Sequence, residues 1–368
     1  MKQKIIDIII KVVAYLLYPL SIMYTVVVAL RNRAFDCGLL KEQQHNVATI
    51  GVGNLSAGGT GKTPLMEYLA NLFQNSYTVA LLSRGYKRKT KGFVLATDTT
   101  TAHDIGDEPC QMHQKFPSIT TAVCEKRNIG VQELLKTNRS IDLVLLDDVY
   151  QHRYIKPNIL ILLTEYANPY YADCVIPFGR LREPRSGYKR ANFIVVTKCP
   201  SELNLDERQK IITKIKPKSW QKIFFSYVDY GMPVNMWDGT TIDLNTVDST
   251  LVVAGIANPK PLIEKVGEMS DASLCQFSDH HDFTLKDVEL IKKQFSAIKA
   301  DNKIILTTEK DYSRLKTSEH KLEISSLPIY YMPIKVKFHK DPTSDISFDK
   351  ELTRMLDDIQ QTKKSTTL

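Results

Sequence analysis

The chain has 368 residues, of which 43% are hydrophobic, and a formal net charge of +8. That length suffices for one large α/β domain and a smaller second one. The basic surplus is mild and forms no module with interleaved aromatic residues, which argues against a nucleic-acid partner. Six cysteines without a Cys-x-x-Cys pair argue against a disulfide-stapled secreted domain and a zinc ribbon, and favour a reducing compartment.

The N-terminal segment is strongly apolar, and residues 12–30 contain no charged side chain. A membrane-spanning helix needs about 20 apolar residues, so the length is borderline for a span. Tyr15, Tyr18 and Tyr24 are typical of the headgroup level of a bilayer. We therefore expect residues 1–34 to form a hydrophobic membrane-anchoring helix that inserts only in part. A spanning helix and a helix buried in the protein core are the alternatives.

Apolar strands alternate with helical segments over residues 35–221, which predicts an α/β fold with a parallel sheet covered by helices on both faces. The expected strands are 46–52, 78–83, 119–123, 143–147, 159–163 and 193–197. The expected helices are 64–73, 108–115, 127–136 and 206–215.

The pattern changes after residue 221. Residues 222–248 predict a two-stranded linker with its turn at Asp238-Gly239. Residues 249–348 predict a smaller C-terminal α/β domain, and residues 349–368 a polar tail that is disordered from about Gln360. The smaller domain is expected to contain strands at 251–255, 304–308 and 329–332 and helices at 259–268 and 285–298.

A glycine-rich segment, GNLSAGGTGKTP, joins the first strand of the core to its first helix. Glycines let backbone N–H groups turn toward phosphate oxygens, and the helix N-terminus adds a partial positive charge. In such a P-loop, Lys62 reaches the β- and γ-phosphates and the Thr63 hydroxyl ligates Mg²⁺. We therefore predict a nucleotide-binding core that uses Ser56, Ala57, Gly58, Gly59, Thr60, Gly61, Lys62, Thr63 and Pro64.

The loop departs from the common pattern, because Ser56 stands where a glycine is usual. The Gly58-Gly59 doublet resembles partition ATPases, but Ala57 replaces the lysine that those proteins carry. A membrane-associated partition ATPase and a GTPase or metallochaperone of the same branch are therefore alternatives. Guanine-binding proteins commonly carry an Asn-Lys-x-Asp motif whose aspartate binds the base. Thr197-Lys198 is not followed by such an aspartate, which favours ATP.

Two aspartates, Asp147 and Asp148, end an apolar strand. In a P-loop fold, carboxylates at this position hold Mg²⁺ directly or through water. We therefore assign Thr63, Asp147 and Asp148 to a magnesium site.

Phosphoryl transfer to an alcohol also needs a group that accepts the hydroxyl proton. Two segments offer one: Asp107 in an acidic turn, and the pair His280 and His281 in SDHHDF. Taken alone, an aspartate such as Asp107 is more often a helix cap, and the histidine pair is also typical of a metal site or a surface loop.

In order along the chain, the motifs GNLSAGGTGKTP, SRGYKRK, GDEP, DDVYQHR, GRLREP, VVTK, GIANP, SDHHDF and TTEKD closely resemble the lipid A tetraacyldisaccharide 4'-kinase family. The resemblance runs to about Met332. It implies a two-domain enzyme at the cytoplasmic face of the inner membrane. Such an enzyme uses ATP and Mg²⁺ to phosphorylate the 4'-hydroxyl of a tetraacylated, lipid-linked glucosamine disaccharide 1-phosphate, and no obligate protein partner is inferred.

The resemblance also assigns roles. Asp107 matches the catalytic base of the family and His280 the histidine that partners it, while Arg182 and Glu183 match a loop beside the nucleotide. A weak base suffices where the proton leaves late in a loose transition state. If His280 comes from the second domain, catalysis depends on domain closure. The residues assigned to catalysis are Asp107, His280 and Lys62.

The sequence departs from the family at Val149, where a glycine is usual, and at Tyr150, where phenylalanine is usual. Val149 puts a turn with positive φ at that position in doubt. Arg84, Arg180 and Arg182 are candidates for binding the 1-phosphate or the nucleotide.

Overall fold

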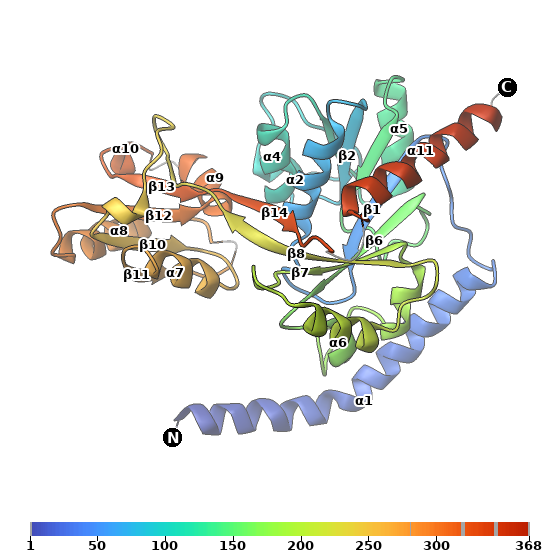
Figure 1. Cartoon of the computed structure of the whole chain (residues 1–368), viewed down its shortest axis with the longest axis horizontal. Coiled ribbons are helices and arrows are strands. Elements are labelled where there is room, and N and C mark those ends of the chain that lie inside the picture. Colours follow the sequence, from blue (N-terminus) through green and yellow to red (C-terminus); the bar gives the residue numbers. More distant parts are fainter. Residues whose placement is uncertain (1, 280, 318–320, 342–344, 367–368) are drawn as a thin grey trace. The chain divides into compact units, whose positions relative to one another are not determined.

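The computed structural model describes residues 2–279, 281–317, 321–341 and 345–366. The chain divides into two compact units, residues 1–228 with 336–368 and residues 229–335 (Figure 1). Each unit is built around its own sheet.

The first unit contains a nine-stranded sheet in the order β14-β8-β7-β6-β1-β5-β2-β4-β3. Its central strand β1 (Ala48–Asn54) is buried along its whole length and runs parallel to both neighbours. A parallel sheet covered on both faces selects such near-continuous apolar strands. The other strands are β2 (Val79–Ser83), β3 (Val94–Leu95), β4 (Thr120–Val123), β5 (Leu143–Leu146), β6 (Ile159–Glu165), β7 (Phe193–Thr197), β8 (Lys222–Tyr230) and β14 (Ile334–Phe338).

Alternate residues of β5 show that helices cover both faces of this sheet. Leu143 and Leu145 pack in one core cluster with α2 (Lys62–Phe73), whereas Val144 and Leu146 pack in another with α5 (Arg127–Thr137). The predicted α/β core is therefore confirmed. The unit also contains α3 (Ala102–Ile105), α4 (Asp107–Lys115), α6 (Leu205–Ile215) and the 3-10 turns η1 (Tyr170–Ala172) and η2 (Arg185–Arg190).

The second unit contains a five-stranded sheet in the order β11-β10-β12-β13-β9. Strand β11 (Asp271–Gln276) was not expected from the sequence, because it is an edge strand with a single buried residue, Cys275. The remaining elements are β9 (Val234–Asn235), β10 (Ser249–Ala254), β12 (Lys303–Thr308), β13 (Ile329–Met332), η3 (Leu244–Thr246), α7 (Lys260–Gly267), α8 (Leu285–Ala297), α9 (Glu309–Thr317) and α10 (Lys321–Ile324).

The predicted two-stranded linker at 222–248 is wrong. Strand β8 pairs with β7 in the first sheet, and β9 pairs with β13 in the second, so the segment is divided between the two sheets and is not a separate linker. The turn at Asp238-Gly239 does form, because Gly239 adopts a φ of 76° and Asn235 N donates to Thr240 O at 2.7 Å.

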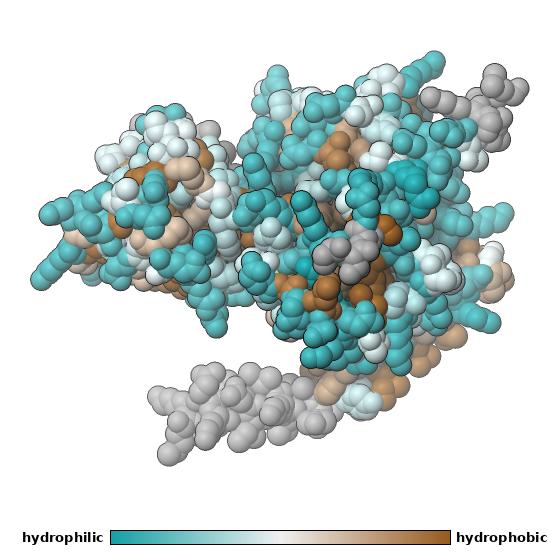
Figure 2. Space-filling model, in the orientation of Figure 1, coloured by the Kyte–Doolittle hydropathy of each residue, from teal (hydrophilic) through white to brown (hydrophobic). Residues whose placement is uncertain are grey.

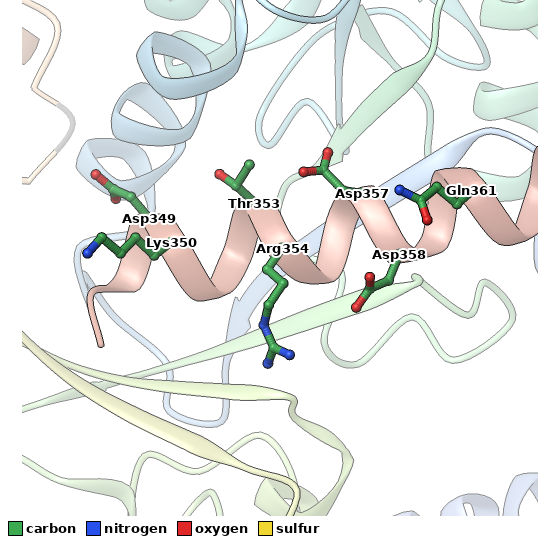
Figure 3. Close-up of a pocket in the computed structure, with 7 residues that line it drawn as sticks. All are labelled: Asp349, Lys350, Thr353, Arg354, Asp357, Asp358 and Gln361. Carbon is green, nitrogen blue, oxygen red and sulfur yellow. The ribbon is translucent and has the colours of Figure 1, made fainter. Parts of the chain in front are cut away.

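The prediction of a disordered polar tail is also wrong, because residues Phe348–Thr366 form helix α11. Phe348, Leu352 and Leu356 are buried against the face of the sheet that α2 covers. Tyr68 and Tyr77 donate from the α2 region to Asp349 and Asp357, at 2.5 and 2.8 Å. The other residues of α11 are mostly polar, and Figure 3 labels seven of them: Asp349, Lys350, Thr353, Arg354, Asp357, Asp358 and Gln361. The polar composition of α11 thus reflects its exposed residues, whereas Phe348, Leu352 and Leu356 pack in the core together with the partly buried Met355 and Ile359.

Helix α1 (Lys2–Asp36) contains the apolar N-terminal segment. One side of the helix packs on the first unit through Ser21 and Phe35, which are both buried. The other side exposes large apolar side chains to solvent (Figure 2), namely Leu20, Ile22, Met23, Val26, Val27 and Leu30. Among the described residues, no helix combines the length and the apolarity that a bilayer span needs.

We predict that Leu352→Ala lowers the free energy of unfolding by about 2–5 kcal/mol, because it leaves a cavity under α11. Urea unfolding followed by circular dichroism measures this loss. Asp358→Ala, on the exposed side of the same helix, is the control and should change stability by less than about 0.5 kcal/mol. Equal effects of the two changes would contradict the packing of α11.

Candidate active site

The glycine-rich loop joins β1 to α2, as a P-loop requires. Gly58 and Gly61 adopt φ angles of 111° and 85°, which side chains with a Cβ rarely adopt. Gly61 is the N-cap of α2, so Lys62 and Thr63 occupy the first turn of the helix. The local sequence therefore places both side chains beside a helix N-terminus, where anions bind.

Two neighbouring segments hold the loop from outside. Ala57 N donates to Arg180 O at 2.6 Å, which ties the loop to the segment around GRLREP. Thr197 Oγ1 donates to Thr60 O at 2.9 Å, and Lys198 Nζ donates to Gly59 O. Thr197 and Lys198 were considered in the sequence only as a base reader, whereas the structure places them as supports of the P-loop.

A cluster of charged and polar side chains lies beside the P-loop. Arg182 donates to both carboxylate oxygens of Asp148, at 2.8 and 3.0 Å. Lys62 Nζ lies 3.7 Å from Asp148 Oδ1 and donates to Asn54 Oδ1 at 3.3 Å. Arg182 also donates to Asn54 O at 3.1 Å and to Asn54 Oδ1. The structure thus brings together three of the predicted site residues, which are Lys62, Asp148 and Arg182.

The two adjacent aspartates have opposite electrostatic environments. Burial alone would raise the pKa of Asp148, but the hydrogen bond from Arg182 and the charges of Lys62, Arg182 and Arg127 lower it to about 2. Burial raises the pKa of Asp147 above its ordinary value, and the negative charge of Asp148 adds to this rise. Asp148 is therefore stabilised as an anion, whereas ionisation of Asp147 costs free energy.

Asp147 is fixed by two contacts from other elements. Ser83 Oγ, at the end of β2, donates to Asp147 Oδ2 at 3.0 Å, and the buried guanidinium of Arg127 donates to Asp147 O at 3.1 Å. Thr63 and Asp147 line the same small hollow, together with Ser83 and Glu108. Hydroxyl and carboxylate oxygens are the ligands that Mg²⁺ prefers, so these residues fit a magnesium site. The sequence assigned no role to Glu108.

Asp107 is the first residue of α4, directly after Gly106, whose φ is 91°. The next residue, Glu108, lines the hollow that contains Thr63 and Asp147, whereas Asp107 is not among the residues that line it. The predicted partner, His280, lies outside the described residues.

His281 belongs to the second unit. His281 Nε2 lies 3.0 Å from Asp287 Oδ2, and its ring stacks on Phe277 with the centroids 4.8 Å apart.

Glu183 is only 2% exposed, and its carboxylate accepts hydrogen bonds from three side chains. The donors are Asn32, Gln151 and Arg190, at 3.1, 2.9 and 2.9 Å. The structure therefore places Glu183 as an internal support of the loop that carries Arg182.

The turn after β5 accommodates Val149 without a positive φ at that position. Asp148 takes the left-handed conformation instead, with φ of 44°. Val149 is buried and its N–H donates to Val52 O at 3.1 Å, while Tyr150 Oη donates to Gly187 O at 2.8 Å. Val149 in place of the usual glycine therefore causes no strain, because the left-handed conformation falls on Asp148 instead.

We predict that asparagine substitutions at the two aspartates change stability in opposite directions. The folded-state pKa of Asp148 is lowered, so its stabilisation is present above the unfolded pKa of about 3.9 and is lost as pH falls toward 2. Asp148→Asn should therefore lower the unfolding midpoint at pH 7. The folded-state pKa of Asp147 is raised, so Asp147→Asn should increase that midpoint. Urea unfolding checks both, and shifts of the same sign would refute the assignment.

Comparisons with known proteins identify the family of the chain. The family model described as "Tetraacyldisaccharide-1-P 4'-kinase" matches residues 13–353. A tetraacyldisaccharide 4'-kinase of Flavobacterium johnsoniae is 46% identical over 325 residues, covering 88% of this chain and 92% of the relative. One of Bacteroides thetaiotaomicron is 43% identical over 334 residues, covering 87% and 88%. A crystal structure of LpxK from Aquifex aeolicus in complex with ATP matches with a TM-score of 0.70 at 25% identity, covering 94% of this chain and 99% of that chain. The chain therefore belongs to the tetraacyldisaccharide 4'-kinase family.

Proposed function

We propose that this chain transfers the γ-phosphate of ATP to the 4'-hydroxyl of a tetraacyl glucosamine disaccharide 1-phosphate at the P-loop. The observation that carries the proposal is the convergence of Lys62, Arg182 and Asp148 beside a helix N-terminus. The similar protein from Aquifex aeolicus was crystallised in complex with ATP, which supports the choice of nucleotide. The family match does not favour a partition ATPase or a metallochaperone.

In this proposal, positive charge neutralises the phosphate that moves. Lys62 lies in the first turn of α2, and Arg182 reaches the same carboxylate from the opposite loop. Phosphoryl transfer needs positioning and charge stabilisation more than covalent chemistry from the protein, which suits two cations near one P-loop. Arg182 and Lys62 would bind phosphate oxygens as their contacts with Asp148 open.

Magnesium would be held by Thr63, Asp147 and Asp148. When bound, the ion neutralises charge on the phosphate oxygens. Asp147 is kept in place by Ser83, and the strained φ of Asp148 fixes the direction of its carboxylate.

Asp107 would accept the proton of the 4'-hydroxyl. Helix α4, which begins at Asp107, is held against α2 because Gln111 and Lys115 both donate to Glu67, at 2.9 and 2.8 Å. These two hydrogen bonds hold the second half of α4 against the P-loop helix. The partnership of His280 with Asp107 remains a prediction.

We further propose that α1 lies in the membrane interface, at the cytoplasmic face of the inner membrane. Its outward side exposes contiguous large apolar residues, with Leu30 65% and Val27 60% exposed, where a soluble surface helix carries polar residues. A tetraacylated substrate stays in the bilayer while ATP stays in water, so the enzyme has to work at that boundary.

We predict that Asp107→Asn lowers phosphate transfer by about 10²–10⁴-fold, because the general base is lost. Radiolabelled transfer from ATP to the disaccharide 1-phosphate lipid in detergent micelles measures it. Asp98→Asn, an exposed aspartate, is the control and should retain the full rate. Full activity of Asp107→Asn would remove the base assignment. ATP hydrolysis without a lipid product in the wild type would overturn the kinase proposal.

We predict that Val26→Glu with Leu30→Glu weakens binding to anionic vesicles at least tenfold, because burial of each large aliphatic side chain contributes about 1.5–3 kcal/mol. Co-sedimentation with vesicles measures the binding. Leu205→Glu, at an exposed position of α6, is the control. Unchanged binding of the double variant would rule out this side of α1 as the membrane surface.

A further inference from the structure

The side of α1 that faces the protein carries polar groups beside the buried Phe35. Three of its side chains, Ser21, Tyr24 and Asn32, hydrogen-bond to loop 174–184, which carries Arg182. An ordinary surface helix places its apolar side inward and its polar side outward, whereas α1 exposes large apolar residues and turns these polar groups inward. These hydrogen bonds tie the inward side of the helix to the loop.

The contacts reach both ends of the loop. Ser21 Oγ donates to Val175 O and accepts from Phe178 N at 3.1 Å, which makes a buried link near the start of the loop. Tyr24 Oη donates to the main-chain oxygen of Arg182 at 3.1 Å. Asn32 Nδ2 donates to Glu183 Oε2, also at 3.1 Å.

From the loop, the connection continues to the charge cluster. The main chain of Arg182 is held on one side by Tyr24 and on the other by the bond from Arg182 N to Leu55 O, 2.7 Å long. Its guanidinium spans Asp148 and Asn54. Gln151 adds a second link, since its Nε2 donates both to Glu183 Oε1 and to Asn54 O, at 2.9 and 2.8 Å. The Arg182 side chain is thus held in place through its own main chain and through the neighbouring Glu183.

We propose that α1 is a positioning element for Arg182, acting through Tyr24 and Asn32. This inference rests on the proposed kinase function and assigns α1 a second role beside the membrane contact. The helix that touches the bilayer also sets the position of a cation at the phosphate site. Tyr24 and Asn32 touch neither nucleotide nor acceptor, so their effect on the reaction passes through Arg182.

A double-mutant cycle tests this coupling, because residues that act through one another give non-additive effects. Tyr24→Phe combined with Asn32→Ala should lower kcat for phosphate transfer about tenfold in the wild-type background. In an Arg182→Gln background, the same pair should cause almost no further loss. The matched control is Thr25→Val, because the Thr25 hydroxyl donates within the helix to Ser21 O at 2.7 Å, and it should leave kcat unchanged.

Two outcomes overturn the proposal: no loss in the wild-type background, or the full tenfold loss repeated on Arg182→Gln. Thermal unfolding of each variant separates positioning from damage to the fold, and we expect midpoints close to that of the parent. If the wild type forms no lipid product, the proposed function fails on its own. In that case, the double-mutant cycle uses the dissociation constant of a fluorescent ATP analogue, measured with Mg²⁺. Additive effects of the substitutions on that constant would overturn the positioning role.

Discussion

The ion pair between Arg182 and Asp148 is the contact on which the geometry of the site depends. Asp148 ends the turn after β5, and Arg182 reaches it from loop 174–184, so the pair joins two segments that are 34 residues apart in the chain. Both side chains also approach the P-loop, through Lys62 and Asn54. Because Arg presents two parallel donors to a carboxylate, this contact fixes direction as well as distance.

The same interaction explains how two neighbouring carboxylates coexist at one strand end. Neighbouring cations keep Asp148 ionised. Burial already disfavours the ionised form of Asp147, and the negative charge of Asp148 beside it raises the pKa of Asp147 further. Asp148 also carries a left-handed φ, a strain that surrounding contacts have to maintain. The raised pKa of Asp147 and the left-handed φ of Asp148 both cost stability at this strand end, whereas the ion pair of Asp148 with Arg182 stabilises it.

The sequence was sufficient for the features that depend on local patterns. A buried strand, a glycine-rich turn and a helix identify the P-loop, and an apolar strand ending in two acids identifies Asp147 and Asp148. It was insufficient where contacts join distant segments, as for Lys198, which bonds to the P-loop, and for Glu183, which bonds to Asn32 and Gln151. Strand β11 and helix α11 were missed because most of their residues face solvent, and few apolar positions reveal their buried sides.

The central claim is that the carboxylates beside Arg182 and Lys62 are where Mg²⁺ acts in phosphate transfer. The Mg²⁺ concentration that gives half-maximal transfer at saturating ATP tests it most directly, measured for the wild type and for Asp148→Asn. The account predicts that the requirement rises by about tenfold or more in the variant, because one metal-binding oxygen pair is lost. An unchanged requirement, with only a lower maximal rate, would contradict it and move the metal away from Asp148.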